Sequence, residues 1–137
     1  MFKKCIICLK HFVETSSFTG PLDNKIHPIR SVLTCESENI IYLLFCVKCK
    51  NAQYVGETQG SLRKRFYTHR SDISRNKGFC THVISHFNGV NHSVNDLRCH
   101  PIEQVYKKIK EYRRERERFW IDTLGTLYPS GLNAIDY

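Results

Sequence analysis

The chain has 137 residues and a mass of 16.1 kDa, the size of one compact domain. Hydrophobic residues make up 41% and charged residues 25%, which is ordinary globular usage and excludes a disordered tail. The longest apolar run, residues 40–47, is far shorter than the ~20 residues that cross a bilayer, so we expect no membrane segment. No apolar stretch follows the charged residues at the N-terminus, so we also expect no export.

The charge balance favours a polyanionic partner. Lys and Arg total 21 against 13 Asp and Glu, which gives a net charge of +8 and a pI near 9.2. Nucleic acid is the first expectation for such a balance. The excess lies in residues 63–77 and 107–118, both predicted helices. A solvated charged face is the alternative, because Glu111, Glu115 and Glu117 interleave with the second run.

The N-terminal third is rich in turn-forming residues, and hydrophobic runs begin after it. Residues 1–37 are predicted to form an irregular segment, and residues 38–137 a folded domain. Residues 40–47 are β-branched, aromatic or aliphatic and predict a buried strand. Gln53–Gly56 predicts a second strand, so the two form a hairpin. Residues 96–105 predict a third strand, which Pro101 restricts to an edge or an irregular position.

Three helices are predicted between and after these strands. Ser61 is the expected N-cap of the first, and its apolar positions recur at four, three and four residues: Leu62, Phe66, His69 and Ile73. A short helix covers residues 81–87 and a long amphipathic one residues 107–124, ending at Gly125. The long helix's stripe is expected to comprise Ile109, Tyr112, Arg116, Phe119, Trp120, Thr123 and Leu124. The predicted fold class is α+β, with a small three-stranded antiparallel sheet flanked by helices.

Seven cysteines without an export signal indicate metal binding more than disulfides. Cys46 and Cys49 have the C-x2-C spacing that lets two thiolates from one turn bind a zinc ion. His86 and His92 are separated by five residues and complete a four-ligand Zn²⁺ set. The alternative is two small core thiols and two surface histidines.

A second cysteine pair lies near the N-terminus. Cys5 and Cys8 have the same spacing, and Cys35 is a candidate third ligand of a second Zn²⁺ site. The fourth ligand stays open, with His11 and His27 both available; incidental cysteines in a flexible segment are the alternative. Cys80 and Cys99 fit neither set and are expected to be buried small hydrophobes.

Some side chains predicted on these elements suit phosphodiester hydrolysis. Tyr42 and Tyr54 lie on adjacent strands, Arg65 and His69 one turn apart on a helix, and Glu117 beside a second apolar stripe. The reaction needs a water to lose a proton, the phosphate charge to be neutralised, and a carboxylate to hold Mg²⁺. Each side chain also has a purely structural interpretation. The tyrosines can belong to the strand core, Arg65 can be a surface cation, His69 a hydrogen-bonded core histidine, and Glu117 the ion-pair partner of a neighbour on its helix.

The same residues resemble the GIY-YIG endonuclease superfamily. Ile40-Ile41-Tyr42, eleven intervening residues and Tyr54-Val55-Gly56 are similar to its paired motif, with Ile40 where glycine usually stands. The resemblance extends from about Asn39 to Asn133 and includes the spacing of Leu62, Arg65 and His69, then Glu117 and Asn133. It implies an Mg²⁺-dependent nuclease.

By this resemblance, Tyr42 and Tyr54 position and help deprotonate the water, with His69 as a proton relay or co-base. Arg65 binds the scissile phosphate, Glu117 holds Mg²⁺ and Asn133 braces the site. Which group is the base stays open. We expect phosphate-backbone contacts from four basic residues: Lys64, Arg70, Lys107 and Arg114.

Within the superfamily the chain most resembles the endonuclease domain of Penelope-like retroelements. The similar stretches are Thr34-Cys35, Asn39–Tyr42, Tyr54–Thr58, His86–Asn88, His92-Ser93, Asp96–Arg98 and Thr126–Asn133. The resemblance implies the Cys46, Cys49, His86 and His92 zinc set. It also implies nuclear DNA as target, one-strand nicking for insertion, and a reverse transcriptase domain as partner. The chain is then a fragment, a relic or an excised domain.

The alternatives are an inactive nucleic-acid-binding zinc module and a structural protein that binds another protein. Target preference and oligomeric state stay open.

Overall fold

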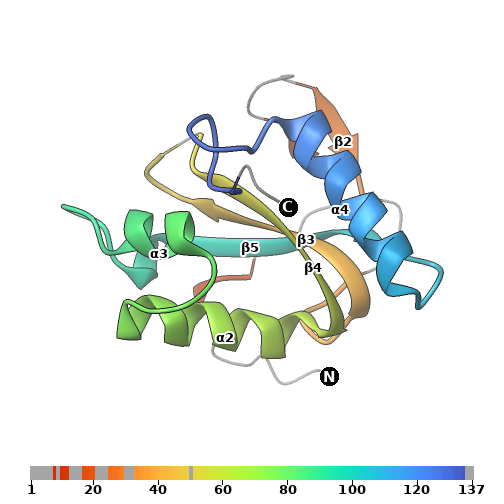
Figure 1. The fold of residues 1–137 in the computed structure, drawn as a ribbon, viewed down its shortest axis with the longest axis horizontal. Helices are drawn as coiled ribbons and strands as arrows, with labels where there is room; N and C mark the ends of the chain where they lie inside the picture. The colour runs from red at the N-terminus through yellow and green to blue at the C-terminus, as the bar shows by residue number, and fades with distance from the viewer. Residues whose placement is uncertain are drawn as a thin grey trace.

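The computed structural model describes residues 8, 10–12, 17–20, 25–29, 33–49 and 51–134. Its elements are β1 (Ser17–Thr19), β2 (Ile26–Pro28), β3 (Glu38–Cys46), β4 (Gln53–Ser61), α2 (Leu62–Arg75), α3 (Thr81–Phe87), the short 3₁₀ helix η1 (Val94–Asp96), β5 (Leu97–Gln104) and α4 (Lys110–Leu124). The predicted α+β class with a three-stranded antiparallel sheet is confirmed (Figure 1). Among these residues, no helix has the length and apolar character needed to span a membrane.

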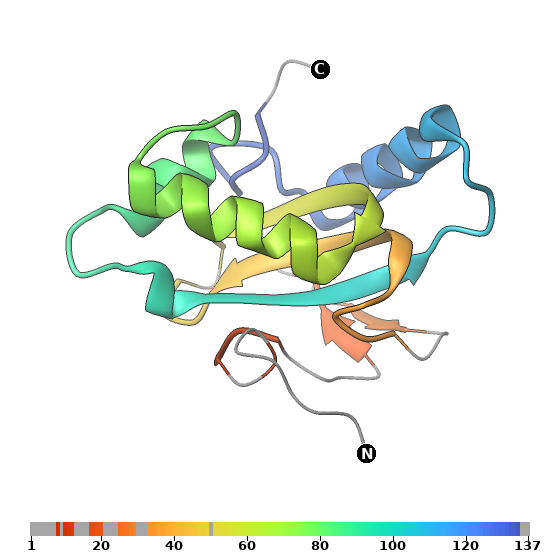
Figure 2. The same ribbon diagram turned by 90° about the horizontal axis from the view of Figure 1, so that it is seen from below.

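Strand β3 is the centre of the sheet, whose order is β4-β3-β5. Its run of apolar residues is continuous because both faces of the strand are covered. Ile40, Tyr42 and Leu44 belong to one hydrophobic core, whereas Ile41 and Leu43 belong to another. The first core is completed by α2 and α3, and the second by α4 with β1. Figures 1 and 2 show α2 and α4 on different sides of the strands.

The local signals for β5 and α2 act as the sequence predicts. Pro101 lies in β5, an edge strand, where the register with β3 shifts. The Ser61 hydroxyl accepts the backbone N–H of Lys64 at 3.2 Å, which caps α2. The buried residues of α2 are those of the predicted stripe: Leu62, Phe66, His69 and Ile73. Strand β4, however, continues past Gly56 to Ser61.

Helix α4 differs from its prediction in its start and its buried face. It begins at Lys110 because Ile109 has an extended backbone (φ −118°), and it ends where Gly125 turns left-handed (φ 66°). The predicted stripe is confirmed at Trp120 and Leu124, which are buried, and is wrong at Ile109 and Phe119, whose side chains are exposed. Arg113 is buried instead. Its guanidinium donates to Glu57 Oε2 at 2.7 Å and to Asn39 Oδ1 at 3.1 Å, which turns this face of the helix towards the sheet.

The described parts of the N-terminal segment pack on the sheet and on α4. β1 and β2 pair as a short antiparallel hairpin that the sequence does not predict. Phe18 and His27 pack on the Trp120 ring, with centroid distances of 5.6 and 5.4 Å. The Cys99 backbone N–H donates to the His11 carbonyl at 2.8 Å, which joins the segment to the free edge of β5. These contacts explain how two short strands form in a turn-rich region.

The buried ion pair of Arg113 generates a stability prediction. Arg113→Ala leaves Glu57 and Asn39 without their shared partner, so the free energy of unfolding should fall by about 2–4 kcal/mol. Arg114→Ala, at the exposed neighbouring position, should change it by no more than about 0.5 kcal/mol. Urea denaturation of the two variants makes the comparison; equal losses would show that the ion pair does not hold α4 to β4.

Candidate active site

Three side chains form a hydrogen-bonded chain between β3 and α2. The Tyr42 hydroxyl lies 2.7 Å from His69 Nε2, and Arg65 Nε donates to the same hydroxyl at 3.3 Å. Burial lowers the pKa of His69 to about 3, so its ring is neutral. Burial also raises the pKa of Tyr42, although Arg65 opposes that shift. The phenol oxygen therefore accepts from Arg65, and the phenol proton is left to donate to His69.

Gly56 provides the space for the Tyr42 ring. The two residues face each other across β3 and β4. A Cβ atom at Gly56 would lie 2.4 Å from both Cζ and the hydroxyl oxygen of Tyr42, which is far inside van der Waals contact. The glycine of the Tyr54-Val55-Gly56 motif is thus explained by a steric requirement. It lets a fully buried tyrosine reach His69.

Tyr54 extends this group into an open cleft. Its ring centroid lies 5.6 Å from that of His69, and its hydroxyl accepts a hydrogen bond from Cys80 Sγ at 3.4 Å. Burial raises the pKa of Tyr54, so the phenol is protonated at neutral pH. The prediction that Cys80 is simply a buried small hydrophobe is wrong, because its thiol is partly exposed and lines the cleft. No sequence motif marks Cys80.

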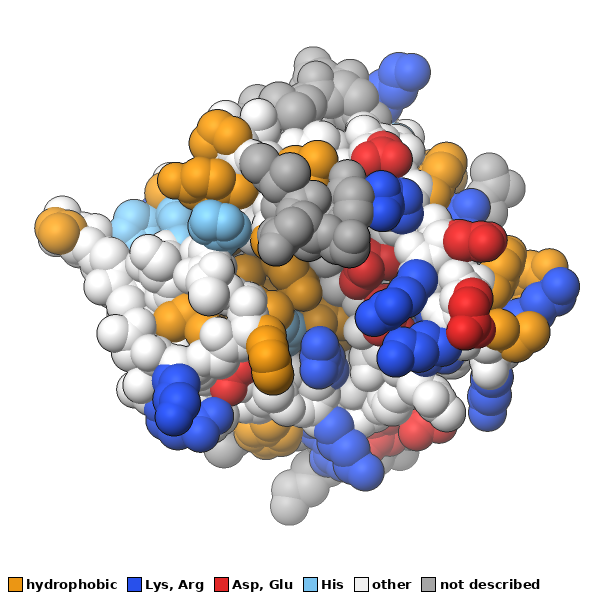
Figure 3. Space-filling view, in the orientation of Figure 1, with side chains coloured by type: hydrophobic (Ala, Val, Ile, Leu, Met, Phe, Trp, Pro, Cys, Tyr) orange, Lys and Arg blue, Asp and Glu red, His pale blue; other side chains and the backbone are white. Residues whose placement is uncertain are grey.

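The cleft has a volume of about 400 Å³ and lies where α2, β4, α4 and the C-terminal loop meet. Its lining residues are Tyr54, Arg65, Phe79, Cys80, Thr81, His82, Arg114, Glu117, Ile121, Leu132, Asn133 and Ala134. Figure 3 shows the face of the molecule seen in Figure 1, where basic and hydrophobic side chains lie next to each other near the middle. Most of the predicted catalytic residues line this cleft, whereas Tyr42 and His69 lie behind it.

Glu117 is the carboxylate that could hold a metal ion in this cleft. Burial and the nearby charge of Glu57 raise the pKa of Glu117 to about 7, while Arg114 and Arg65 act in the opposite direction. Glu57 is paired with Arg113, but no ion pair of Glu117 occurs among the described residues. A divalent cation would offset this crowding of negative charge. One carboxylate suits Mg²⁺, which keeps most of its waters.

Asn133 joins the C-terminal loop to β4. Its side chain accepts from the Val55 N–H at 2.9 Å and donates to the Val55 carbonyl at 3.0 Å. The Thr126 hydroxyl donates to the same Asn133 oxygen at 2.6 Å. Both the oxygen and the nitrogen of the Asn133 amide are thus hydrogen-bonded. Asn133 therefore holds the C-terminal loop against β4. The strand residue that it bonds, Val55, is the neighbour of Tyr54 in the chain.

The four predicted phosphate-binding residues lie on different parts of the surface. Arg114 lines the cleft, and Lys64, Arg70 and Lys107 do not. Lys107 lies 5.4 Å from the centroid of the Tyr106 ring, before α4 begins. Arg70, on α2, lies close enough to the buried His11 for its charge to help lower the pKa of that ring, after the larger effect of burial. The structure thus places one of the four beside the other cleft residues.

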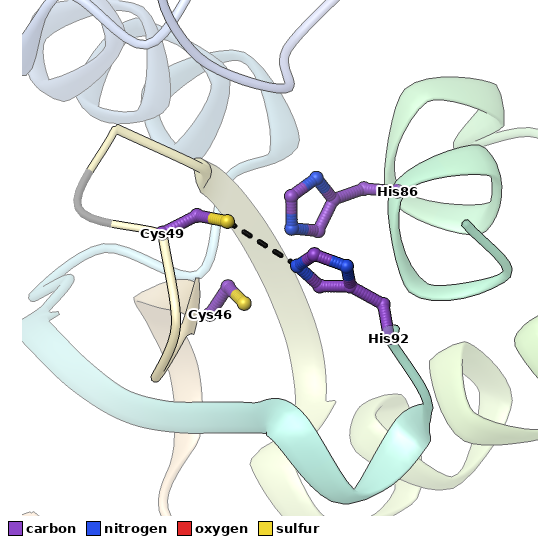
Figure 4. A group of neighbouring side chains, drawn as sticks. All are labelled: Cys46, Cys49, His86 and His92. Carbon is purple, nitrogen blue, oxygen red and sulfur yellow. Dashed lines mark hydrogen bonds between the residues drawn. The ribbon is translucent and has the colours of Figure 1, made fainter. Parts of the chain in front are cut away.

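The second cluster consists of Cys46, Cys49, His86 and His92, whose ligand atoms all lie within 4.8 Å of one another (Figure 4). Cys49 Sγ is 3.2 Å from His92 Nε2. His92 Nδ1 lies 2.9 Å from the Val90 carbonyl, an arrangement that leaves Nε2 free to bind a metal. His86 Nε2 is buried without a hydrogen-bond partner in the described part of the chain. Two thiols and two imidazoles around one point fit a tetrahedral metal ion.

The predicted N-terminal metal site is only partly visible. Cys5 lies outside the described residues. Cys8 Sγ lies 3.2 Å from Cys35 Sγ, so these two thiols are neighbours. His11 Nδ1 bonds the Leu97 carbonyl at 2.7 Å and its ring packs on Phe66. Within residues 8–134 as described, no second group of three metal-binding side chains forms.

Comparison with known proteins yields one match. No family model and no curated protein matches the chain. Among solved structures, the chain is similar to the catalytic domain of homing endonuclease I-TevI, with a TM-score of 0.59 and 27% sequence identity over 70% of this chain and 97% of that one. The chain has the GIY-YIG fold. This structural similarity supports a relationship to that superfamily.

The contact between Gly56 and Tyr42 generates a second prediction. Gly56→Ala forces the Tyr42 ring to move, which breaks its bond to His69 and should lower the free energy of unfolding by about 1–3 kcal/mol. Gly60→Ala is the matched control, because its new Cβ meets only Thr58 Oγ1, at 3.9 Å. Chemical denaturation measures both variants, and a Gly56→Ala protein as stable as the control would contradict the steric argument.

The Cys/His cluster predicts a bound metal. Elemental analysis of the purified protein should find one zinc ion per chain, and a strong chelator should destabilise the fold by about 4 kcal/mol, as for a ligand present at 1,000 times its Kd. Cys49→Ser and His92→Asn should each lose the zinc. His82→Asn should keep it, because His82 lies on the same helix as His86 but outside the cluster. Absence of metal together with a chelator-insensitive melting temperature would exclude the site.

Proposed function

We propose that the chain is a Mg²⁺-dependent DNA endonuclease that hydrolyses one strand at a time. The observation that supports this most is the convergence of Tyr54, Arg65 and Glu117, from β4, α2 and α4, on one cleft. The structural match is the catalytic domain of an endonuclease, and its similarity covers 70% of the chain. The net charge of +8 favours a polyanionic substrate.

Arg65 is the proposed phosphate-binding group. Its side chain lines the cleft, and its Nε is held by the Tyr42 hydroxyl at 3.3 Å. That contact leaves the two terminal nitrogens to bind the oxygens of the scissile phosphate and to stabilise the charge that develops there. Tyr42 and His69 lie behind the cleft, so their proposed role is to orient Arg65.

Tyr54 is the phenol that the substrate water can reach, because it lines the cleft and Tyr42 does not. Its hydroxyl orients the water for attack on phosphorus. The new P–O bond forms as the bond to the leaving strand breaks, and the proton from water passes through the Tyr54 hydroxyl and solvent to the departing oxygen. Glu117 would hold Mg²⁺, whose chemistry is to polarise the phosphate and stabilise the leaving oxygen.

The zinc cluster is proposed to be structural. Its thiols come from the end of β3 and the turn after it, and its imidazoles from α3 and the loop that follows (Figure 4). A metal ion there would fix α3 against the β3–β4 hairpin. Because Cys80 directly precedes α3 and contacts Tyr54, the same ion would hold one wall of the cleft.

We infer that the biological role is that of a Penelope-like retroelement endonuclease. The support is the sequence resemblance over Asn39–Asn133, including the position of the cysteine pair inside the hairpin. In this role the chain nicks nuclear DNA to start target-primed insertion, and a reverse transcriptase domain of the element is its partner. The alternative is a catalytically inactive zinc module that only binds nucleic acid. The following experiment distinguishes the nuclease from that module.

The nuclease proposal predicts a metal-dependent nicking activity centred on Glu117. With supercoiled plasmid and Mg²⁺, the protein should produce the nicked form, and Glu117→Gln should slow nicking by roughly 100-fold or more. Glu115→Gln, on the same helix with an exposed side chain, should nick at the normal rate. A zinc-loaded, folded protein that leaves the plasmid supercoiled under all conditions would instead support the binding module.

A further inference from the structure

Phe79 stands at the mouth of the cleft with its side chain fully exposed. It lies in the loop between α2 and α3, and the next residue, Cys80, contacts the Tyr54 hydroxyl. An aromatic ring exposed to water lacks the stabilisation that burial of its apolar surface would provide. Phe79 therefore lines the same cleft as Tyr54, next in the chain to the residue that contacts the Tyr54 hydroxyl, and no described part of the chain covers its ring.

The loop that carries Phe79 has a defined backbone. The Lys77 N–H donates to the Asp72 carbonyl at 3.0 Å, and the Thr81 N–H donates to the Phe79 carbonyl at 2.9 Å. Gly78 has φ +153°, and a Cβ there would lie 2.5 Å from the Asp72 carboxylate. This glycine lets the loop close tightly on the end of α2. The ring is thus presented outward by a fixed loop.

A second aromatic surface lies on the same rim. The rings of His82 and Tyr128 stack with a centroid distance of 3.9 Å and an interplanar angle of 7°. His82 lines the cleft, and Tyr128 is half exposed. The cations of the cleft, Arg65 and Arg114, complete a surface that combines positive charge with flat aromatic groups.

We propose that Phe79 stacks on an unpaired base beside the scissile phosphate, so that the preferred substrate is DNA with at least one unpaired nucleotide at the cut. The inference rests on the proposed nuclease function. Cations that bind the backbone and aromatic faces that bind bases are the combination by which proteins hold unstacked nucleotides. In a perfect duplex the bases are stacked on each other and cannot offer a free face. A protein partner would require a continuous apolar patch, whereas the neighbours of Phe79 include Arg65, Arg114 and His82.

Equilibrium binding in a buffer without Mg²⁺ and without chelator tests this without cleavage, because it leaves any zinc in the Cys/His cluster. Two duplexes are compared, one fully paired and one with a single bulged 2-aminopurine, whose fluorescence falls when an aromatic ring stacks on it. The wild-type protein should bind the bulged duplex about tenfold more tightly, with quenching, and Phe79→Ala should lose both the preference and the quenching. Phe79→Trp should retain them. Val90→Ala, which removes another exposed apolar side chain away from the cleft, should match the wild type.

The outcomes separate this inference from the nuclease proposal. Binding selectivity that depends on Phe79 supports the stacking role even if no plasmid is nicked. Nicking with equal affinity for both duplexes overturns the stacking role and leaves the nuclease intact. A bulge preference that survives in Phe79→Ala also overturns it, as does a Phe79-dependent self-association in sedimentation experiments without base selectivity. Phe79→Ala should melt at the wild-type temperature, because the side chain has no covering contacts.

Discussion

The buried hydroxyl of Tyr42 is the constraint around which the site is arranged. A phenol in the core must keep its hydrogen bonds, because an unpaired hydroxyl there costs about 1–3 kcal/mol. His69 and Arg65, one helical turn apart on α2, provide both partners. The bonds set the rotation of α2 relative to β3 and bring the Arg65 guanidinium to the cleft. Gly56 completes the arrangement by leaving the ring room to lie over β4.

The other wall of the cleft depends on a balance of charge between β4 and α4. Arg113 is buried between Asn39 and Glu57, so α4 cannot slide or rotate without breaking that pair. One turn later on the same helix, Glu117 faces the region of Glu57 and has a raised pKa. The arginine thus neutralises one carboxylate and leaves the other to interact with a cation. Stability of the helix and chemistry of the site share the same group of residues.

Local signals in the sequence predicted much of the fold, and contacts between distant segments account for what it missed. The Ser61 cap, the stripe from Leu62 to Ile73 and the edge position of the Pro101 strand each follow from one residue type and its near neighbours. The Cys/His cluster followed from spacing alone, and the structure brings its four ligands together.

Burial of Arg113 could not be predicted in this way, because its partner Glu57 is 56 residues away. The same holds for the contact of Cys80 with Tyr54, 26 residues apart, and for the hairpin β1–β2, whose packing against Trp120 depends on α4. The tyrosines, Arg65, His69, Glu117 and Asn133 came from a family resemblance, and the structure gathers them at the cleft and immediately behind it. Their chemical roles remain predictions.

The loop held by Asn133 also affects how the molecule behaves among its own copies. β4 and β5 are the edges of the sheet, and an exposed strand edge is a template for pairing with another chain. On β4, the Leu132 N–H bonds the Gln53 carbonyl at 2.8 Å, and the Asn133 amide occupies both polar groups of Val55. On β5, the Cys99 N–H is taken by His11. Segments far apart in the chain thus occupy part of each edge, which hinders the pairing of another strand with this small sheet.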